Sequence, residues 1–129
     1  MIPVFQTIID RNRGNCFSAA LASIMNLKLE DVPYFRQLGK EWAIELFDFL
    51  NKNNLEMHGC KYGTDLLDYN IGIDGYYIVC GRSRFYADDI NAKHSVVFFD
   101  RKMVHDPNPI GTGLFTIDYC YMIEKRKEG

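Results

Sequence analysis

The sequence predicts an α+β protein in which N-terminal helices pack against an antiparallel β-sheet. Two observations carry this prediction. Apolar residues follow helical spacing only in the first half of the chain, whereas the second half contains short runs rich in β-branched and aromatic residues, separated by Gly, Asp, Asn and Pro. Helices that precede strands in this way are typical of a fold with helices on one side of a sheet.

The composition indicates one ordinary globular domain over residues 1–129, with 47% hydrophobic and 25% charged residues. A formal net charge of −2 gives no general attraction to nucleic acid or to an anionic membrane. No apolar run approaches the roughly 20 residues of a membrane span, and the first residues lack the charged-then-apolar order of a secretory signal. We therefore expect a cytoplasmic protein.

The first half of the chain begins with the apolar segment IPVFQTII (residues 2–9), which predicts a strand. A helix is predicted from Asn15 to Leu27, because its first residue is a good cap and the apolar residues after it recur at i, i+3, i+4 and i+7. Residues 28–35 predict a turn, since a proline disfavours helix at the residue before it. A second helix is predicted from about Lys40 to Asn53, with an apolar face of Trp42, Leu46, Phe49 and Leu50.

Four runs in the second half of the chain predict strands, at residues 75–80, 95–100, 102–106 and 114–125. The turn between the second and third runs is placed at Asp100-Arg101-Lys102. These two strands then form an antiparallel hairpin.

Cys16 occupies an unusual place, the first turn of the first predicted helix. Exposed N–H groups and the helix dipole favour an anion there, and cysteine pKa values are commonly lowered at this position. The alternative is that Cys16 is a small buried apolar residue, as free cysteines often are. We expect it and the other three cysteines to be reduced thiols. No CxxC pair occurs, so we expect no structural zinc and no other cofactor.

The segment AKHSVVFFDRKMVHDPNPIG (residues 92–111) supplies partners for this thiol. If the hairpin turns as predicted, His94 and Asp106 lie at the same end of the two strands. A carboxylate there fixes the imidazole tautomer and leaves the other nitrogen to face the thiol. The helix start supplies N–H donors for an oxyanion, and Gln6 adds a side-chain donor. In the alternative, His94 is a strand-edge residue, Asp106 starts a turn and Gln6 faces solvent.

These stretches resemble papain-like cysteine peptidases, and in size the chain is most similar to the compact C39-type domains that process bacteriocins. GNCFSAALA (residues 14–22) resembles the G-x-C-aromatic entry to the central helix of that family. KHSVVFF (93–99) resembles its His-small-Val-Val strand, and HDPNPIG (105–111) resembles the D-P-x-x-x-G close of the C39-type triad.

The resemblance implies a papain-like fold with a triad of Cys16, His94 and Asp106, and with Gln6 at the oxyanion hole. We therefore predict a cysteine hydrolase, a peptidase or amidase, that acts on a peptide, amide or small-molecule substrate through a thioester acyl-enzyme. One alternative is a binding module that holds a ligand in the same cleft without turnover. Another is an acyl or amine transferase, because arylamine acetyltransferases and transglutaminases also use Cys, His and Asp in this order.

Four further residues are candidates for substrate binding: Asn15, Arg82, Arg84 and Asn108. Arg82 and Arg84 lie in a predicted loop, where they form either a solvated turn or a clamp for a substrate carboxylate or another anion. Asn15 either caps the helix or donates to the oxyanion.

The other two histidines are not assigned to the site. Strand alternation directs His105 away from Asp106, to the other side of the sheet. His58 stands beside Cys60 in EMHGCKYG (residues 56–63), which suggests metal or redox chemistry or, as we predict, an ordinary loop residue.

Overall fold

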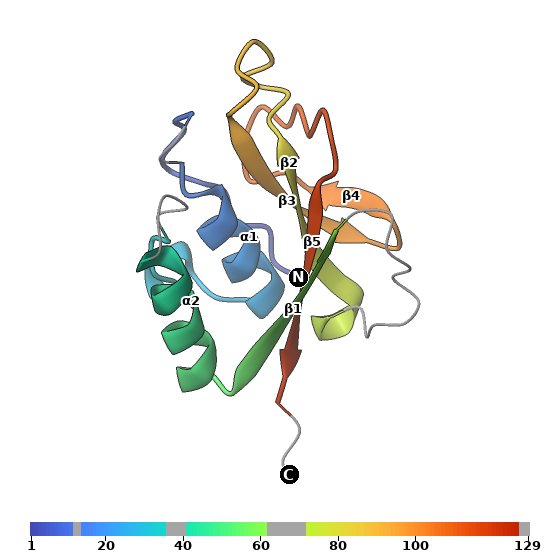
Figure 1. Cartoon of the computed structure of the whole chain (residues 1–129). Helices are drawn as coiled ribbons and strands as arrows, with labels where there is room; N and C mark the ends of the chain where they lie inside the picture. The colour runs from blue at the N-terminus through green and yellow to red at the C-terminus, as the bar shows by residue number, and fades with distance from the viewer. Residues whose placement is uncertain (12–13, 36–40, 62–71, 127–129) are drawn as a thin grey trace.

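Figure 1 shows the chain as a computed structural model, which describes residues 1–11, 14–35, 41–61 and 72–126. In these residues, helices α1 (Cys16–Met25) and α2 (Glu41–Lys52) pack on a five-stranded antiparallel sheet. In their order across the sheet, the strands are β1 (Leu55–Lys61), β5 (Tyr119–Lys125), β2 (Tyr76–Arg82), β3 (Lys93–Phe99) and β4 (Lys102–His105). Short 3₁₀ turns cover Leu29–Asp31 and Ile73–Gly75. The predicted α+β class is confirmed. No helix in the described ranges is long and apolar enough to cross a membrane.

Helix α1 lies at the centre of the core, and nine of its ten residues are buried. Its alanines allow close packing on β2 and β3, and the ring of Phe17 packs edge-on against the rings of Phe35, Trp42 and Tyr121. Complete burial of a phenylalanine side chain contributes about 1.5–3 kcal/mol to stability. The start of α1, and Cys16 with it, is therefore held firmly against the sheet.

Both predicted helices are confirmed within a few residues, but the predicted strand at residues 2–9 is wrong. The backbone of this segment finds partners outside any sheet. The N–H of Val4 donates to Ser23 Oγ (2.9 Å), and the N–H of Gln6 donates to the carbonyl oxygen of Pro107 (2.9 Å). Because these partners satisfy backbone groups that a sheet would otherwise pair, the segment connects α1 to the turn after β4 instead.

The predicted strand at residues 114–125 is only partly correct, because the regular strand β5 begins at Tyr119. The residues before β5 run along the end of β2 through irregular contacts, such as the hydrogen bond from the N–H of Phe115 to the carbonyl oxygen of Arg82 (2.9 Å). Gly81 permits this close approach, since a Cβ at that position would clash with the carbonyl oxygen of Thr116.

Strand β1 lies where the sequence predicted a loop, so the prediction for His58 is wrong. The strand pairs with β5 along its whole length. It is an edge strand in which only Leu55 and Cys60 are buried, so its apolar residues do not alternate. That is why periodicity did not reveal it.

The predicted β3–β4 hairpin is confirmed, and its turn falls at Asp100 and Arg101. Both residues adopt left-handed backbone angles, with φ of 50° and 64°, as a two-residue turn of type I′ requires. A β-bulge follows in the ladder, because Phe98 lies opposite Met103 whereas Val97 lies opposite His105.

This bulge decides on which face of the sheet Asp106 lies. In a regular hairpin, Asp106 would lie opposite Ser95. The one-residue shift places His105 opposite Val97, so the next residue, Asp106, is directed to the face of the sheet on which His94 lies, and its Oδ1 is 2.6 Å from His94 Nε2. The bulge therefore brings the carboxylate to the histidine.

Candidate active site

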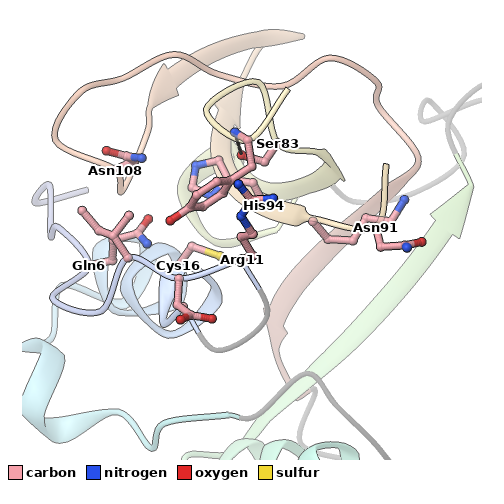
Figure 2. Close-up of a pocket in the computed structure, with 12 residues that line it drawn as sticks. Gln6, Arg11, Cys16, Ser83, Asn91, His94 and Asn108 are labelled. Atoms are coloured by element: carbon pink, nitrogen blue, oxygen red, sulfur yellow. Dashed lines mark hydrogen bonds between the residues drawn. The ribbon is translucent and has the colours of Figure 1, made fainter. Parts of the chain in front are cut away.

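A cleft with a volume of about 100 Å³ opens where the start of α1 meets the start of β3 (Figure 2). The N-terminal segment, the loop after β2 and the turn after β4 complete its walls. Four of the predicted site residues line it: Gln6, Cys16, His94 and Asn108. The structure thus gathers residues from four parts of the sequence around one thiol.

Cys16 is the first residue of α1, and 6% of its surface is exposed. Burial by itself raises the pKa of a thiol. The hydrogen bond and charge of His94, together with hydrogen bonds from Ser95, outweigh burial and lower the pKa of Cys16 from its ordinary value of 9.0. The N–H groups of the first helical turn also favour a negative charge at this place. The thiolate of Cys16 therefore forms more readily than that of an ordinary cysteine.

His94 is held by Asp106 through a short, buried hydrogen bond of 2.6 Å between Nε2 and Oδ1. Asp106 in turn accepts the N–H of Asn108 at Oδ1 (2.9 Å) and the N–H of Gly113 at Oδ2 (2.8 Å). With both oxygens engaged, the carboxylate cannot turn away from the ring. Since Nε2 faces Asp106, Nδ1 is the nitrogen that meets Cys16.

The charges of the three residues support one another. Burial by itself lowers the pKa of His94, but the hydrogen bond to Asp106 and the contact with Cys16 raise this pKa to about 9. Burial likewise acts to raise the pKa of Asp106, but the hydrogen bond and charge of His94 hold it below the ordinary value. All three directions favour a thiolate beside an imidazolium, with an ionised carboxylate behind it.

Gln6 is 7% exposed and lines the same cleft as Cys16 (Figure 2). Its Nε2 donates to the carbonyl oxygen of Ile8 (3.0 Å), which fixes the orientation of the amide and uses one of its two N–H groups. The buried Oε1 has no hydrogen-bond partner among the described residues. The side chain therefore retains hydrogen-bonding capacity at the cleft.

Asn15 lies at the N-cap position of α1, but the prediction that its side chain caps the helix is wrong. Its Oδ1 accepts the N–H groups of Thr7 (3.0 Å) and Ile8 (2.9 Å), and its Nδ2 donates to Thr7 Oγ1 (3.0 Å). These bonds hold the segment that carries Gln6. The structure does not bring Asn15 to the lining of the cleft.

Arg82 and Arg84 do not line the cleft either. Arg82 is the last residue of β2 rather than a loop residue, which corrects the prediction. Both guanidinium groups lie over the ring of Phe115, with centroid distances of 5.5 Å and 5.0 Å, and Arg84 Nε donates to the carbonyl oxygen of Leu114 (3.4 Å). Their position gives no support to a clamp on a substrate at Cys16.

Sequence reasoning passed over Lys93 and Ser95, the two neighbours of His94. Lys93 lines the cleft and pairs with Asp118 at 3.3 Å. Ser95 is 1% exposed, its hydroxyl lies 3.1 Å from the sulfur of Cys80, and it contributes to the lowered pKa of Cys16. The sequence feature that could have pointed to both residues is their position directly before and after His94. The side chains of Lys93 and Ser95 point to the face of the sheet opposite to that of His94. All three residues nevertheless lie at the end of β3 where α1 begins.

His105 contacts the N-terminal segment and not Asp106, in line with the sequence prediction. Its Nε2 donates to the carbonyl oxygen of Val4 (2.7 Å), and its ring packs edge-on against Phe5 at a centroid distance of 5.0 Å. His105 therefore does not compete with His94 for the carboxylate.

Three side chains able to bind a metal ion lie on β1 and β5, at the opposite edge of the sheet from β4. Glu56, His58 and Glu124 place one ligand atom each within 4.8 Å of one another. His58 is 44% exposed, and its Nε2 lies 3.4 Å from Glu56 and 3.6 Å from Glu124. This partly exposed group belongs to a different region from the cleft and takes no part in it.

Comparison with known proteins finds no matching family model, no similar curated protein and no similar solved structure. The function of the site therefore has to follow from the chemistry of its own residues.

Proposed function

We propose that the chain is a papain-like, C39-like cysteine hydrolase that cleaves a peptide or amide bond through a thioester acyl-enzyme. The observation that carries the proposal is the convergence of Cys16, His94 and Asp106 beside a cleft. A nucleophile, a base and a group that orients the base are the minimal set for covalent catalysis at a thiol. The order of these residues in the chain, and the position of the thiol at the start of a buried helix, support the papain-like assignment.

The proposed reaction begins with the thiolate of Cys16. It attacks the substrate carbonyl carbon and forms a tetrahedral intermediate. The protonated His94 then gives its proton to the leaving amine, and the C–N bond breaks to leave a thioester. A water molecule gives a proton to His94 and attacks the thioester, the C–S bond breaks to release the acid, and the thiolate of Cys16 remains beside the protonated His94. Asp106 keeps the imidazole oriented through both steps.

The oxyanion of each tetrahedral intermediate needs hydrogen-bond donors. The first turn of α1 offers backbone N–H groups that have no acceptor within the helix. The second N–H of the Gln6 amide supports a side-chain contribution from the neighbouring wall of the cleft. Because the reaction needs a reduced thiol, a reducing compartment such as the cytoplasm suits it, and the four cysteines are unpaired.

The test uses p-nitrophenyl acetate, a small activated ester that can acylate a reactive thiol. The protein is mixed with the ester, and the adduct is located by mass spectrometry while release of p-nitrophenol is followed over time. We expect an acetyl group on Cys16 that disappears in water, with continued release of p-nitrophenol. Cys16→Ala should abolish both signals. The matched control Cys60→Ala, which alters a thiol on β1, should keep both.

Each other outcome points to a different function. A stable acetyl group that leaves only after an amine is added would indicate a transferase. No adduct on Cys16 in the folded protein would overturn the hydrolase and leave a ligand-binding module. After an adduct is found, a panel of peptide amides with a fluorogenic leaving group would define the substrate.

A further inference from the structure

Asn108 is a cleft residue whose hydrogen bonds inside the protein leave one polar group unused. It follows β4 and is 4% exposed. Its backbone N–H donates to Asp106 Oδ1 (2.9 Å), and its backbone carbonyl oxygen accepts the N–H of Gly111 (2.9 Å). Its side-chain Oδ1 accepts the N–H of Ile110 (3.0 Å). Only the N–H groups of its Nδ2 have no acceptor among the described residues.

The orientation of this amide is fixed by its oxygen. Because a backbone N–H donates to the amide oxygen and not to the amide nitrogen, Ile110 holds Oδ1 on its own side. Figure 2 shows the nitrogen of Asn108 on the side of the cleft and the oxygen turned away from it. A buried N–H costs free energy unless an acceptor meets it. The free donors are therefore offered to whatever enters the cleft.

Asn108 lies on the side of the cleft that carries His94. Its backbone N–H and the Nε2 of His94 both contact Asp106 Oδ1, at 2.9 Å and 2.6 Å. In the proposed reaction His94 gives its proton to the amine that leaves, so this amine has to lie beside the imidazole. The free donors of Asn108 therefore border the part of the cleft that receives the leaving group.

We propose that Asn108 binds the leaving part of the substrate, with its Nδ2 donating to the carbonyl oxygen of the residue whose amine leaves. This inference rests on the proposed hydrolase and narrows its substrate class. In a peptide, that carbonyl supplies the oxygen nearest to the leaving nitrogen on the leaving side. A primary amide has no oxygen there. The substrate is therefore a bond within a peptide chain and not a terminal amide.

The reverse of cleavage gives a direct test, because an amine added to the acyl-enzyme occupies the place of the leaving group. p-Nitrophenyl acetate first forms the acetyl thioester on Cys16 and releases p-nitrophenol. The amine then attacks the thioester carbon and passes a proton to His94. The C–S bond breaks, which releases the N-acetyl amide and leaves the thiolate of Cys16 beside the protonated His94. Water competes for the same thioester, so the ratio of N-acetyl amide to acetate measures how well the amine is captured.

Two amines of similar size separate the proposed contact from ordinary nucleophilicity. Glycinamide carries a carbonyl oxygen where a peptide has one, whereas n-butylamine has as many non-hydrogen atoms and no oxygen. Asn108→Asp keeps an oxygen for the N–H of Ile110 but loses the N–H donors, and Asn108→Leu loses both. Each variant should lower the capture ratio of glycinamide by about 3–10-fold, the size of one uncharged hydrogen bond, and leave that of n-butylamine unchanged. NMR spectroscopy of the products measures both ratios.

The matched control is Asn53→Asp, which removes the same kind of donor outside the cleft. Asn53 follows α2, and its Nδ2 donates to the carbonyl oxygen of Phe49 (2.8 Å). This variant should keep both capture ratios. The thermal midpoint of every variant is measured in parallel to establish that it is folded.

An unchanged glycinamide ratio in a folded Asn108 variant would overturn the inference, as would an equal fall for both amines. Slower acetylation of Cys16 with both ratios unchanged would also overturn it, and would assign the amide to the oxyanion instead. If neither variant folds, the parent protein decides. Its preference for glycinamide over n-butylamine has to exceed that of S-acetylglutathione, a free thioester, and an equal preference would overturn the inference.

The same experiment separates this inference from the proposed hydrolase. If p-nitrophenyl acetate leaves no acetyl group on Cys16 of the folded parent protein, the hydrolase is rejected and the inference falls with it. If the acetyl group forms and is released by water, but the two amines do not differ in the way described, the inference alone is rejected.

Discussion

Two histidines in this protein lie beside carboxylates, and they differ in almost every physical respect. His94 and Asp106 are 8% and 3% exposed in their side chains, and their atoms are 2.6 Å apart. His58 is 44% exposed and lies 3.4 Å and 3.6 Å from two glutamates on β1 and β5. The same residue types thus form an oriented, charged unit in one region and a solvated group in the other.

The difference arises from what holds the carboxylates. The backbone N–H groups of Asn108 and Gly113 donate to both oxygens of Asp106, so its position is set by the chain itself. Glu56 and Glu124 lie directly opposite each other across the ladder, where like charges repel. A histidine gains a defined role when its partner is fixed by backbone donors, and nearness to a carboxylate is not enough.

The largest expected effect is on stability, from removal of each carboxylate. Asp106→Ala leaves a buried imidazolium without its partner and should lower the free energy of unfolding by about 3–5 kcal/mol. Glu56→Ala removes an exposed charge and should cost at most about 1 kcal/mol. Urea denaturation of the two variants measures both values. Equal losses would remove the distinction between the two groups.

A milder substitution separates orientation from folding. Asp106→Asn keeps the size of the side chain but can donate to the ring and so select the wrong tautomer, and we expect alkylation of Cys16 at pH 6 to slow by about 10–100-fold. The matched variant Glu124→Gln should leave the rate unchanged. The thermal midpoint is followed in parallel. Unchanged reactivity in a folded Asp106→Asn protein would reduce Asp106 to a turn residue.

The dependence of stability on pH should differ between the parent protein and a variant that lacks the thiol of Cys16. In the parent protein, the pKa of folded Cys16 is lowered from its ordinary value of 9.0, and the pKa of His94 is raised from 6.5 to about 9. A lowered thiol pKa makes stability rise with pH, and a raised imidazole pKa makes stability fall with pH. The contributions of the two residues to the pH dependence of stability therefore oppose each other.

Cys16→Ala should make the stability of the protein depend on pH through His94 alone. The folded variant still holds the proton on His94 through Asp106, whereas the unfolded chain loses it above pH 6.5. The thermal midpoint of the variant should therefore fall as the pH rises through the raised pKa of His94. We expect this fall to exceed that of the parent protein by on the order of 5 °C. His94→Gln on the same background should remove this decline, and a decline that persists would contradict its assignment to His94.

The smallest effect is expected at His58. His58→Gln should change neither the alkylation of Cys16 nor, by more than about 0.5 kcal/mol, the free energy of unfolding. Denaturation and alkylation at pH 6 measure both. A clear loss of Cys16 reactivity in this variant would mean that His58 on β1 influences the cleft, which would contradict the view that the two histidines act independently.

Much of this site could be predicted from the sequence, because its residues lie next to strong local signals. Cys16 follows a helix boundary, and His94 and Asp106 flank a hairpin whose turn residues are recognisable. The sequence did not reveal the bulge that turns Asp106 to the face of His94, because a bulge depends on pairing between two strands. The same holds for Asn15, whose capping role was lost to competition from the backbone of Thr7 and Ile8.

The errors in the fold have a similar origin. The segment at residues 2–9 has the composition of a strand, but its hydrogen-bond partners belong to α1 and to the turn after β4. Strand β1 has the composition of a loop and is ordered by its register with β5. In both places tertiary partners decide the backbone conformation, and they lie far away in the sequence.

If His94 and Asp106 activate Cys16 as a thiolate, the four cysteines should differ in reactivity in the native protein, and alkylation measures this difference directly. Iodoacetamide is applied at pH 6.5, and the alkylation rate of each cysteine is read by mass spectrometry. We expect Cys16 to react at least about tenfold faster than Cys60, Cys80 and Cys120, because burial raises the pKa of Cys80 to about 12 and of Cys120 to about 11. His94→Gln should remove this advantage. A Cys16 that reacts no faster than the other three cysteines in the folded protein would show that His94 and Asp106 do not activate it.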